Sequence, residues 1–406
     1  MSQIPIHLTT PDNLPFEPWH PISRLEEETD PATPLAVTTM SSSQQDPQSP
    51  KGKATSPAPA AAPAPLTTEA QDAAGILPAT HWTEQPLPED DFDDGASSIG
   101  SFTSSTASLS SSIYQYREVQ GRTYHAEMGT AEAWEPNDKR HVDAMELLHH
   151  AIMLQMDGKL YFSPLDGKKL DKVLDIATGS GLWAMDFADE FPNTEVIGTD
   201  VSPIQPTWVP ANVKFELEDC NSEWTWPENT FDFVNLRMLV GIVDDWDALF
   251  RNAYRVAKPG AWVESYAPQS EFGCDDGTVK EGGAMDQWTK VFFEGGKRLG
   301  KTFRVYQEDL QRKCMEAAGF VDIQFKDIQV PVGVWHPDKK LAEIGLWWKL
   351  AVEADLEGYI NYLWHSVLGW TPEEAKAFAR HFKKDLNDPK IHGYFMARVA
   401  WGRKPE

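Results

Sequence analysis

Cysteine is scarce in this chain of 406 residues, which contains Cys220, Cys274 and Cys314 and no other. Three scattered cysteines cannot form a disulfide framework, and the sequence has neither a Cys-x-x-Cys pair nor a His-Glu-x-x-His run, so we expect no metal site. Long apolar runs are also missing: no stretch approaches the roughly 18 apolar residues that a membrane-spanning helix needs. The segment Met1–His7 lacks the basic and apolar regions of a secretory signal. We therefore expect a soluble, intracellular protein, and the sequence does not separate nucleus from cytoplasm.

Basic residues are outnumbered as well. The chain has 36 Lys and Arg against 62 Asp and Glu, which gives a formal net charge of -26. Proteins that bind DNA or RNA through its phosphates need a basic surface. The charge balance therefore argues against nucleic acid as a direct partner.

The first quarter of the chain contains few of the aromatic and branched apolar residues that form a core. Residues 1–112 are rich in Ser, Pro, Thr, Ala and acids. Such a segment buries too little surface to offset the entropy lost on ordering. We predict a disordered acidic arm over 1–112, dispensable for folding, and a single domain over 113–406. The Pro-rich and Ser/Thr-rich tracts of the arm suit phosphorylation or capture of a regulatory protein partner.

Beyond the arm, apolar residues follow helical and strand periods in turn. Apolar residues at helical spacing, after a capping Asn137-Asp138, predict a helix over 139–156. Strands then alternate with helices, which implies a parallel sheet with right-handed crossovers. The expected strands are 173–176, 195–200, 213–217, 231–236, 261–265, 321–330 and 392–401, and further helices are expected after 181 and at 246–256 and 310–318. The last two strands are separated by an insertion, 331–391, with helical patterns at 341–356 and 372–386.

The sharpest motif is the turn Thr178-Gly179-Ser180-Gly181, which follows the first of these strands. A glycine-rich turn lets the backbone approach a ligand closely and points a helix N-terminus toward it, whereas an ordinary tight turn needs one glycine. Asp200 ends the second strand, where an acid can accept both ribose hydroxyls, and Asp219 follows the third, where a carboxylate can accept the adenine amino group. Together with Asp175, these acids fit a nucleoside that lies across the sheet edge.

A nicotinamide dinucleotide is the competing ligand. Its fingerprint is Gly-x-Gly-x-x-Gly, and here Ala184 occupies the third glycine position after Gly179 and Gly181. Alanine can sometimes replace that glycine, so this interpretation is weakened without being removed. Asp175, just before the turn, suits the ammonium of S-adenosyl-L-methionine better than a diphosphate, because opposite charges attract.

The run Val173–Gly181, the acid Asp200 and the pair Asp219-Cys220 resemble the first motifs of the seven-stranded Rossmann-like methyltransferases. The chain is more closely similar to the fungal LaeA-like group, which includes velvet-complex regulators of secondary metabolism. The segments that carry this second resemblance are 121–126, 195–206, 208–210, 237–239, 258–260 and 390–392. The resemblance implies a mixed seven-stranded sheet whose last strand is antiparallel, and S-adenosyl-L-methionine as the cofactor.

By that resemblance, three residues, Asp175, Gly179 and Gly181, would hold the methionine end of the cofactor. Asp200 would hold the ribose and Asp219 the adenine, with Val201 and Cys220 beside the rings. Ala177 also belongs to the motif, at a position where the wider superfamily usually has glycine. Alanine fits there if its φ is negative.

The catalytic residues stay open, because methyl transfer from a sulfonium depends mainly on placing the nucleophile and excluding water. Arg237 is a candidate at the end of a strand, although an ion pair with a neighbouring carboxylate is the favoured interpretation. His150 and its neighbour His149 are candidate general bases, with ordinary packing favoured. The Trp-rich insertion is a candidate substrate lid, but an aromatic stripe at helical spacing is more often core.

We therefore expect an S-adenosyl-L-methionine-dependent methyltransferase whose acceptor is either a small metabolite or a protein side chain. The main alternative is a regulator, weakly catalytic or non-catalytic, that uses the fold as an interaction module. A nicotinamide oxidoreductase comes third.

Overall fold

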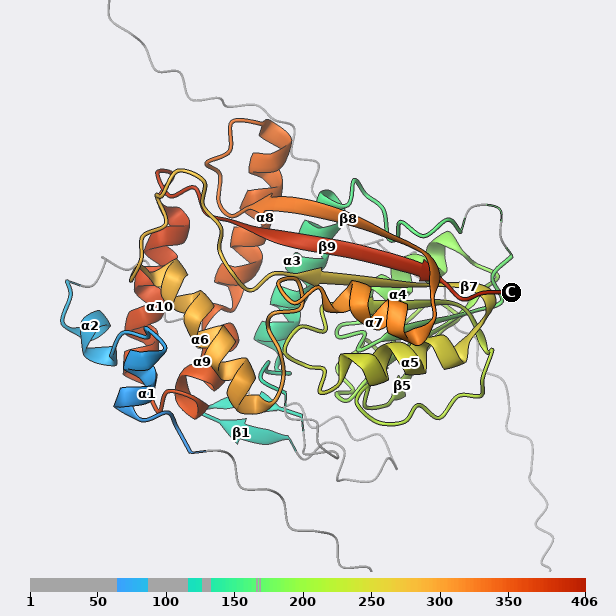
Figure 1. The fold of residues 1–406 in the computed structure, drawn as a ribbon, viewed down its shortest axis with the longest axis horizontal. Coiled ribbons are helices and arrows are strands. Elements are labelled where there is room, and N and C mark those ends of the chain that lie inside the picture. The colour runs from blue at the N-terminus through green and yellow to red at the C-terminus, as the bar shows by residue number, and fades with distance from the viewer. Residues whose placement is uncertain (1–63, 87–115, 126–132, 166, 168) are drawn as a thin grey trace, which may run out of the picture. The chain divides into compact units, whose positions relative to one another are not determined.

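Seven strands form one sheet in the order β5-β4-β3-β6-β7-β9-β8 in the computed structural model, which describes residues 64–86, 116–125, 133–165, 167 and 169–406 (Figure 1). Their bounds are β3 Lys172–Ile176, β4 Glu195–Asp200, β5 Val213–Leu217, β6 Phe231–Arg237, β7 Ala257–Pro268, β8 Val321–Pro331 and β9 Tyr394–Arg403. The first five pair in parallel, and β9 runs antiparallel to both β7 and β8. The mixed seven-stranded sheet with an antiparallel last strand is confirmed.

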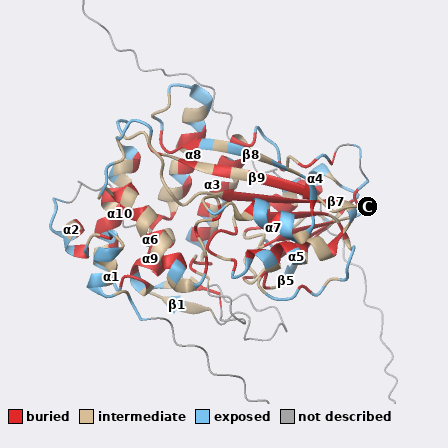
Figure 2. Cartoon of the chain, in the orientation of Figure 1, coloured by how far each residue is buried: buried red, intermediate tan, exposed pale blue. Residues whose placement is uncertain are grey.

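The strands at the centre of the sheet are apolar on both faces because helices cover both. Buried residues follow β3, β4, β6 and β7 and continue along α3, α9 and α10 (Figure 2). The helices between the strands are α3 Lys139–Gln155, α4 Leu182–Glu190, α5 Trp246–Val256, α6 Ala284–Leu299 and α7 Leu310–Ala318. Their starts follow local chemistry: Asp138 accepts a hydrogen bond from His141 N at the start of α3, and Asp245 accepts one from Ala248 N at α5.

The insertion between β8 and β9 contains three helices, α8 Lys339–Ala354, α9 Leu356–Ser366 and α10 Pro372–Asn387. Thr371 and Glu374 form a capping box at α10, with Pro372 at its first position. In Figure 1 these helices and α6 gather beside one end of the sheet. The two helical patterns predicted in the insertion correspond to α8 and α10, whereas α6 and α9 were not predicted.

The structure differs from the sequence interpretation at the start of one strand and in one additional hairpin. A strand was expected at 261–265, but β7 begins earlier, at Ala257, which pairs with Phe231 across an irregular register. A small antiparallel hairpin, β1 Arg117–Val119 and β2 Arg122–Tyr124, precedes α3 and was not predicted. Among the described residues, no helix is both long enough and apolar enough to span a bilayer.

The predicted arm is corrected in one part. Residues 64–86 contain α1 Thr68–Ala73 and α2 Ala79–Thr83, and Trp82 of α2 is buried against Phe378 of α10, with ring centroids 5.1 Å apart. The segment was missed because it buries only a few apolar side chains, too few for a periodic signal. Residues 1–63 and 87–115 lie outside the described residues.

Candidate functional site

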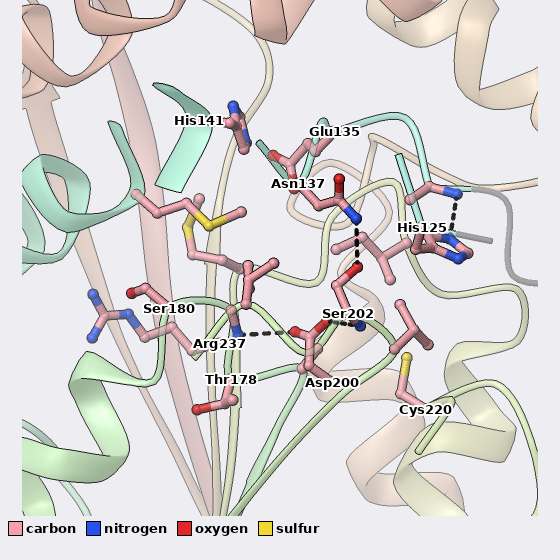
Figure 3. A pocket seen from close by; sticks show the side chains of 18 of the residues that line it. His125, Glu135, Asn137, His141, Thr178, Ser180, Asp200, Ser202, Cys220 and Arg237 are labelled. Atoms are coloured by element: carbon pink, nitrogen blue, oxygen red, sulfur yellow. Dashed lines mark hydrogen bonds between the residues drawn. The ribbon is translucent and has the colours of Figure 1, made fainter. Parts of the chain in front are cut away.

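A pocket of about 180 Å³ lies where β3, β4, β5 and β6 end at their carboxyl edge (Figure 3). We call it the glycine-turn pocket. Seven of the eight predicted cofactor residues line it, drawn from three separate strand ends; they are Asp175, Ala177, Gly179, Asp200, Val201, Asp219 and Cys220. Their close approach supports a single ligand site there.

The eighth, Gly181, does not line this pocket. It precedes α4 with φ +83°, and a Cβ added there would lie 2.4 Å from the Phe215 ring. Glycine is therefore required for the turn and for packing, and direct contact with the ligand is not needed to explain it. Ala177 has φ +52°, so the condition under which alanine would fit there, a negative φ, is not met. An alanine in the left-handed region carries backbone strain, which is often located at functional sites.

Asp200 ties the end of β4 to the glycine turn. Its Oδ2 accepts a hydrogen bond from Gly179 N at 2.9 Å, and its Oδ1 accepts one from Ser202 N at 2.9 Å (Figure 3). Burial raises the pKa of Asp200 to about 6 against the lowering effect of these N–H donors. A carboxylate has about four lone-pair positions, so two hydrogen bonds leave room for ligand hydroxyls.

Asp175 fixes the turn from the other side. Its Oδ1 accepts a hydrogen bond from Asn235 Nδ2 at 2.8 Å, and its Oδ2 accepts one from Thr178 Oγ1 at 2.5 Å. Burial raises the pKa of Asp175 to about 6, while these hydrogen bonds and the charge of Arg237 oppose the rise. The side chain therefore joins β3, β6 and the turn at one point.

The loop after β5 supplies the far end of the pocket. Asp219 accepts a hydrogen bond from Asn221 N at 2.9 Å, and both Asp219 and Cys220 are buried. Burial also raises the pKa of Cys220 to about 12, so its side chain presents an uncharged thiol. An apolar thiol beside an accepting carboxylate is suited to a flat heterocycle with an amino group.

Arg237, at the end of β6, lines the glycine-turn pocket, and the expected ion pair is not present. Its guanidinium makes no hydrogen bond or ion pair within the described part of the chain. Burial lowers the pKa of Arg237, while the nearby Tyr266 and Asp175 oppose this. The pocket thus contains a cation that is available to an anionic ligand group.

The two candidate histidines, His149 and His150, differ in their position relative to the pocket. His150 is exposed and its ring contacts Trp347 of α8, with centroids 4.3 Å apart, so it does not line the pocket. His149 does line it, but its Nε2 is 2.8 Å from Asp186 Oδ2. Burial lowers the pKa of His149, and the charge of Arg237 adds to this effect. His150 therefore lies outside the glycine-turn pocket, which agrees with the favoured interpretation of ordinary packing.

Sequence reasoning missed the residues that cover the pocket from above the sheet. Glu135, Asn137 and His141 come from the start of α3 and the segment before it, and Tyr359 comes from α9. Neither segment contains a sequence motif that predicts a position in the pocket. The insertion therefore does reach the pocket through Tyr359, while Trp364, one of the Trp residues considered for a lid, is fully buried in the core. A lid function stays a prediction.

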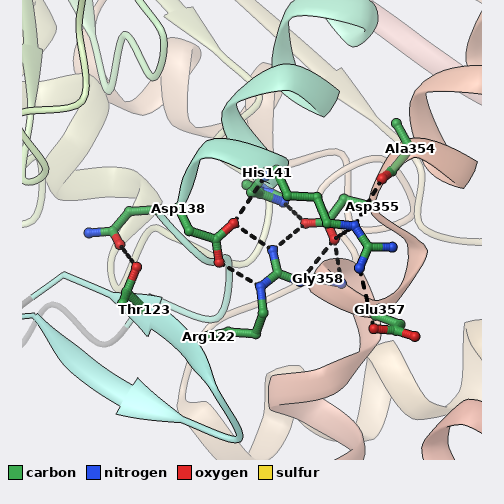
Figure 4. A network of polar contacts seen from close by, with 10 residues as sticks. Arg122, Thr123, Asp138, His141, Ala354, Asp355, Glu357 and Gly358 are labelled. Atoms are coloured by element: carbon green, nitrogen blue, oxygen red, sulfur yellow. Dashed lines mark hydrogen bonds and ion pairs between the residues drawn. The ribbon is translucent and has the colours of Figure 1, made fainter. Parts of the chain in front are cut away.

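An ion-pair network holds these covering segments together (Figure 4). The guanidinium of Arg122, on β2, donates to Asp138 and, at 2.9 and 2.7 Å, to both oxygens of Asp355. His141 Nδ1 lies 2.9 Å from Asp355 Oδ2. Burial favours a higher pKa for Asp355, but the hydrogen bonds from His141 and Arg122 outweigh it and hold the pKa below its ordinary value. The hairpin, α3 and the insertion are thereby joined at one buried carboxylate.

The sequence of the chain is similar to those of known methyltransferases. A family model described as a methyltransferase domain matches residues 147–324. The Methyltransferase pytC of Aspergillus terreus is 32% identical over 303 residues, which cover 74% of this chain and 92% of that protein. The Secondary metabolism regulator LAE1 of Cochliobolus heterostrophus is 30% identical over 276 residues, 67% of this chain and 89% of that protein. The chain belongs to the LaeA-like methyltransferase family. A further member, the Probable methyltransferase tdiE of Emericella nidulans, is 31% identical over 271 residues, 66% of this chain and 84% of that protein.

Proposed function

We propose that this LaeA-like methyltransferase binds S-adenosyl-L-methionine in the glycine-turn pocket and transfers its methyl group to an acceptor. The observation that carries the proposal is a set of complementary groups along one pocket. The carboxyl groups of Asp219 and Asp200 and the guanidinium of Arg237 follow one another across three strand ends. The ligand carries an adenine amino group, a ribose diol and a carboxylate in the same succession.

The residues present fit the cofactor. Asp219 would accept from the adenine amino group, beside Cys220 and Val201, and Asp200 would accept from the ribose hydroxyls. Arg237, which lacks a partner among the described residues, would hold the methionine carboxylate. Gly179 has φ +58°, which glycine adopts without strain, and because it has no side chain it leaves the backbone of the turn open to a ligand. When bound, the cofactor supplies an electrophilic methyl group on a sulfonium.

Calorimetric titration with S-adenosylhomocysteine and with NAD tests the proposal. We expect the former to bind and NAD not to bind. Arg237→Gln should weaken S-adenosylhomocysteine about tenfold to hundredfold, from the roughly 1.5–3 kcal/mol of a hydrogen bond to a charged group. It should leave methylthioadenosine, which has no carboxylate, unchanged.

The control variant is Arg251→Gln, on the exposed face of α5, which should alter neither ligand. Binding of NAD without binding of S-adenosylhomocysteine would remove the proposal. An equal loss for both ligands in Arg237→Gln would remove the carboxylate assignment.

A regulator that uses the fold as an interaction module is the second candidate, favoured by the name of the relative LAE1. The predicted arm, whose residues lie mainly outside the described ranges, would supply a partner-binding segment. The weakened cofactor binding expected in Arg237→Gln separates the two functions when cofactor is limiting. A purely structural module would keep its biological effect in that variant, whereas an enzyme would lose it.

A further inference from the structure

A second cavity, of about 130 Å³, adjoins the glycine-turn pocket and plays no part in the cofactor assignment. Nine of its twenty lining residues are aromatic, so we call it the aromatic pocket. They come from different elements: α6 supplies Trp288, α8 supplies Trp348 and α10 supplies Phe382. Trp288 and Phe382 stack with centroids 4.5 Å apart. An apolar cavity of about 150 Å³ takes up benzene. The aromatic pocket is similar in volume and shares part of its lining with the glycine-turn pocket, so it has room for an aromatic ring.

The two pockets meet at five shared lining residues, Trp134, Glu135, Leu148, Met238 and Tyr359. Met238 directly follows β6 and has φ +63°, a conformation that is strained for a side chain of this kind. A molecule in the aromatic pocket would therefore reach the cofactor at this junction.

The junction carries a donor and an acceptor, both available. Trp134 is 6% exposed, and its Nε1 is buried without a hydrogen-bond partner within the described residues. A buried polar group without a partner costs about 1–3 kcal/mol, which a ligand oxygen would recover. Glu135 makes no hydrogen bond or ion pair in the described ranges, and burial raises its pKa. A hydroxyl group both accepts and donates, so one hydroxyl can satisfy both residues.

The charges of the residues that line the aromatic pocket restrict which ligands can bind there. Among the described residues that line the aromatic pocket there is no Lys, Arg or His, while Glu135 and Glu271 both belong to it. Glu271 accepts hydrogen bonds from Gln269 and Gln307 at 3.1 and 2.9 Å. An anionic acceptor would lose its hydration there without finding a counterion.

We propose that the aromatic pocket binds the methyl acceptor, and that this acceptor is a small aromatic molecule with a hydroxyl group and no anionic group. The inference rests on the proposed methyltransferase function. The hydroxyl oxygen forms a bond to the methyl carbon as the carbon–sulfur bond of the sulfonium donor breaks. The hydroxyl proton passes to the Glu135 carboxylate, and the donor leaves as a neutral thioether.

Calorimetry with three naphthalene probes tests the pocket in the presence of S-adenosylhomocysteine. The probes are 2-naphthol, 2-methylnaphthalene and 2-naphthoate, which share a ring system and differ in hydrogen bonding and charge. We expect 2-naphthol to bind at least tenfold more tightly than 2-naphthoate. Trp134→Phe, which keeps a ring and removes the N–H, should weaken 2-naphthol at least fivefold and leave 2-methylnaphthalene unchanged.

A variant that fills the aromatic pocket provides a second test. Val352→Trp places a large side chain in the aromatic pocket and should weaken 2-naphthol at least tenfold, while S-adenosylhomocysteine binding stays within twofold. The matched control Leu350→Trp, at an exposed position of the same helix, should change neither ligand. Equal affinity for 2-naphthol and 2-naphthoate, or unchanged 2-naphthol binding in Val352→Trp, would overturn the inference. Failure of S-adenosylhomocysteine to bind the unmodified chain would instead overturn the proposed function.

Discussion

Substitution of Asp355 by asparagine removes the charge at the centre of the network that joins the hairpin, α3 and the insertion (Figure 4). The carboxylate is fully buried and accepts from Arg122, from His141 and, at 3.2 Å, from Gly358 N. A Cβ at residue 358 would lie 1.8 Å from Asp355 Oδ2, so glycine is needed for that contact. An amide at residue 355 can accept fewer hydrogen bonds and cannot neutralise Arg122.

The expected loss in the free energy of unfolding follows from the burial of the ion pair. Removal of one partner of a buried ion pair costs about 3–5 kcal/mol. Arg122, whose side chain is 13% exposed, keeps Asp138 as a partner, so we expect the lower end, about 3 kcal/mol. For a folded unit of this size that loss lowers the melting temperature by roughly 6 °C.

Urea unfolding and thermal melting measure the effect. The control is Glu357→Gln, which removes the partly exposed partner of the half-exposed Arg140, at 3.4 Å in the same network. Exposed pairs contribute about 0.2–1 kcal/mol, so this variant should melt within roughly 2 °C of the unmodified protein. If Asp355→Asn unfolds with a free energy within about 1 kcal/mol of the unmodified chain, the network does not hold the covering segments in place.

Three further predictions concern backbone strain, pH and the arm. Ala177→Gly should raise the free energy of unfolding by roughly 1 kcal/mol, because glycine adopts φ +52° without strain; an unchanged or lower urea midpoint would contradict this. Burial raises the pKa of Glu264 to about 7 from 4.5, so between these pH values the folded protein keeps a proton that the unfolded chain releases. The contribution of Glu264 to the free energy of unfolding is therefore greatest below pH 4.5 and falls by about 3 kcal/mol up to pH 7. Glu264→Gln should remove that decline, which urea unfolding at pH 5 and pH 8 measures; an identical decline in the variant would refute the assignment. A chain that begins at residue 64 should keep the full melting temperature, whereas one that begins at residue 113 should lose roughly 6 °C or more, because the buried Trp82 contributes about 3–5 kcal/mol; equal melting of both would show that α1 and α2 are dispensable.

The central sheet could be predicted because its strands are short, apolar and separated by glycine or capping residues. The strands 195–200 and 213–217 and the helix 246–256 were predicted with the bounds that the structure has. The start of β7 could not be predicted, since Lys258-Pro259-Gly260 has turn chemistry and yet continues a strand through tertiary pairing. The helix α2 was missed because α10, about 300 residues later, supplies its packing, and α1 buries no residue that would give a periodic signal.

Part of the candidate site could likewise be predicted from the sequence, and part could not. The motif residues share one edge of the sheet because parallel strands end together, so sequence spacing was enough to place Asp175, Asp200 and Asp219 in one pocket. Glu135 and His141 could not be identified, because their position depends on contacts across the fold. His141 reaches its place through Asp355, which lies 214 residues away in the sequence. Arg237 was a candidate from its position at a strand end, but its lack of a partner among the described residues depends on side chains that are distant in the sequence.

A crystal structure of the full chain with S-adenosylhomocysteine tests the proposed cofactor site most directly. We expect the ligand in the glycine-turn pocket, with ribose hydroxyls within hydrogen-bond distance of Asp200, the adenine amino group at Asp219 and the carboxylate at Arg237. The sulfur should face the junction between Trp134 and Glu135. A ligand bound elsewhere, or one in this pocket with its carboxylate at Asp219 and its adenine at Arg237, would contradict it.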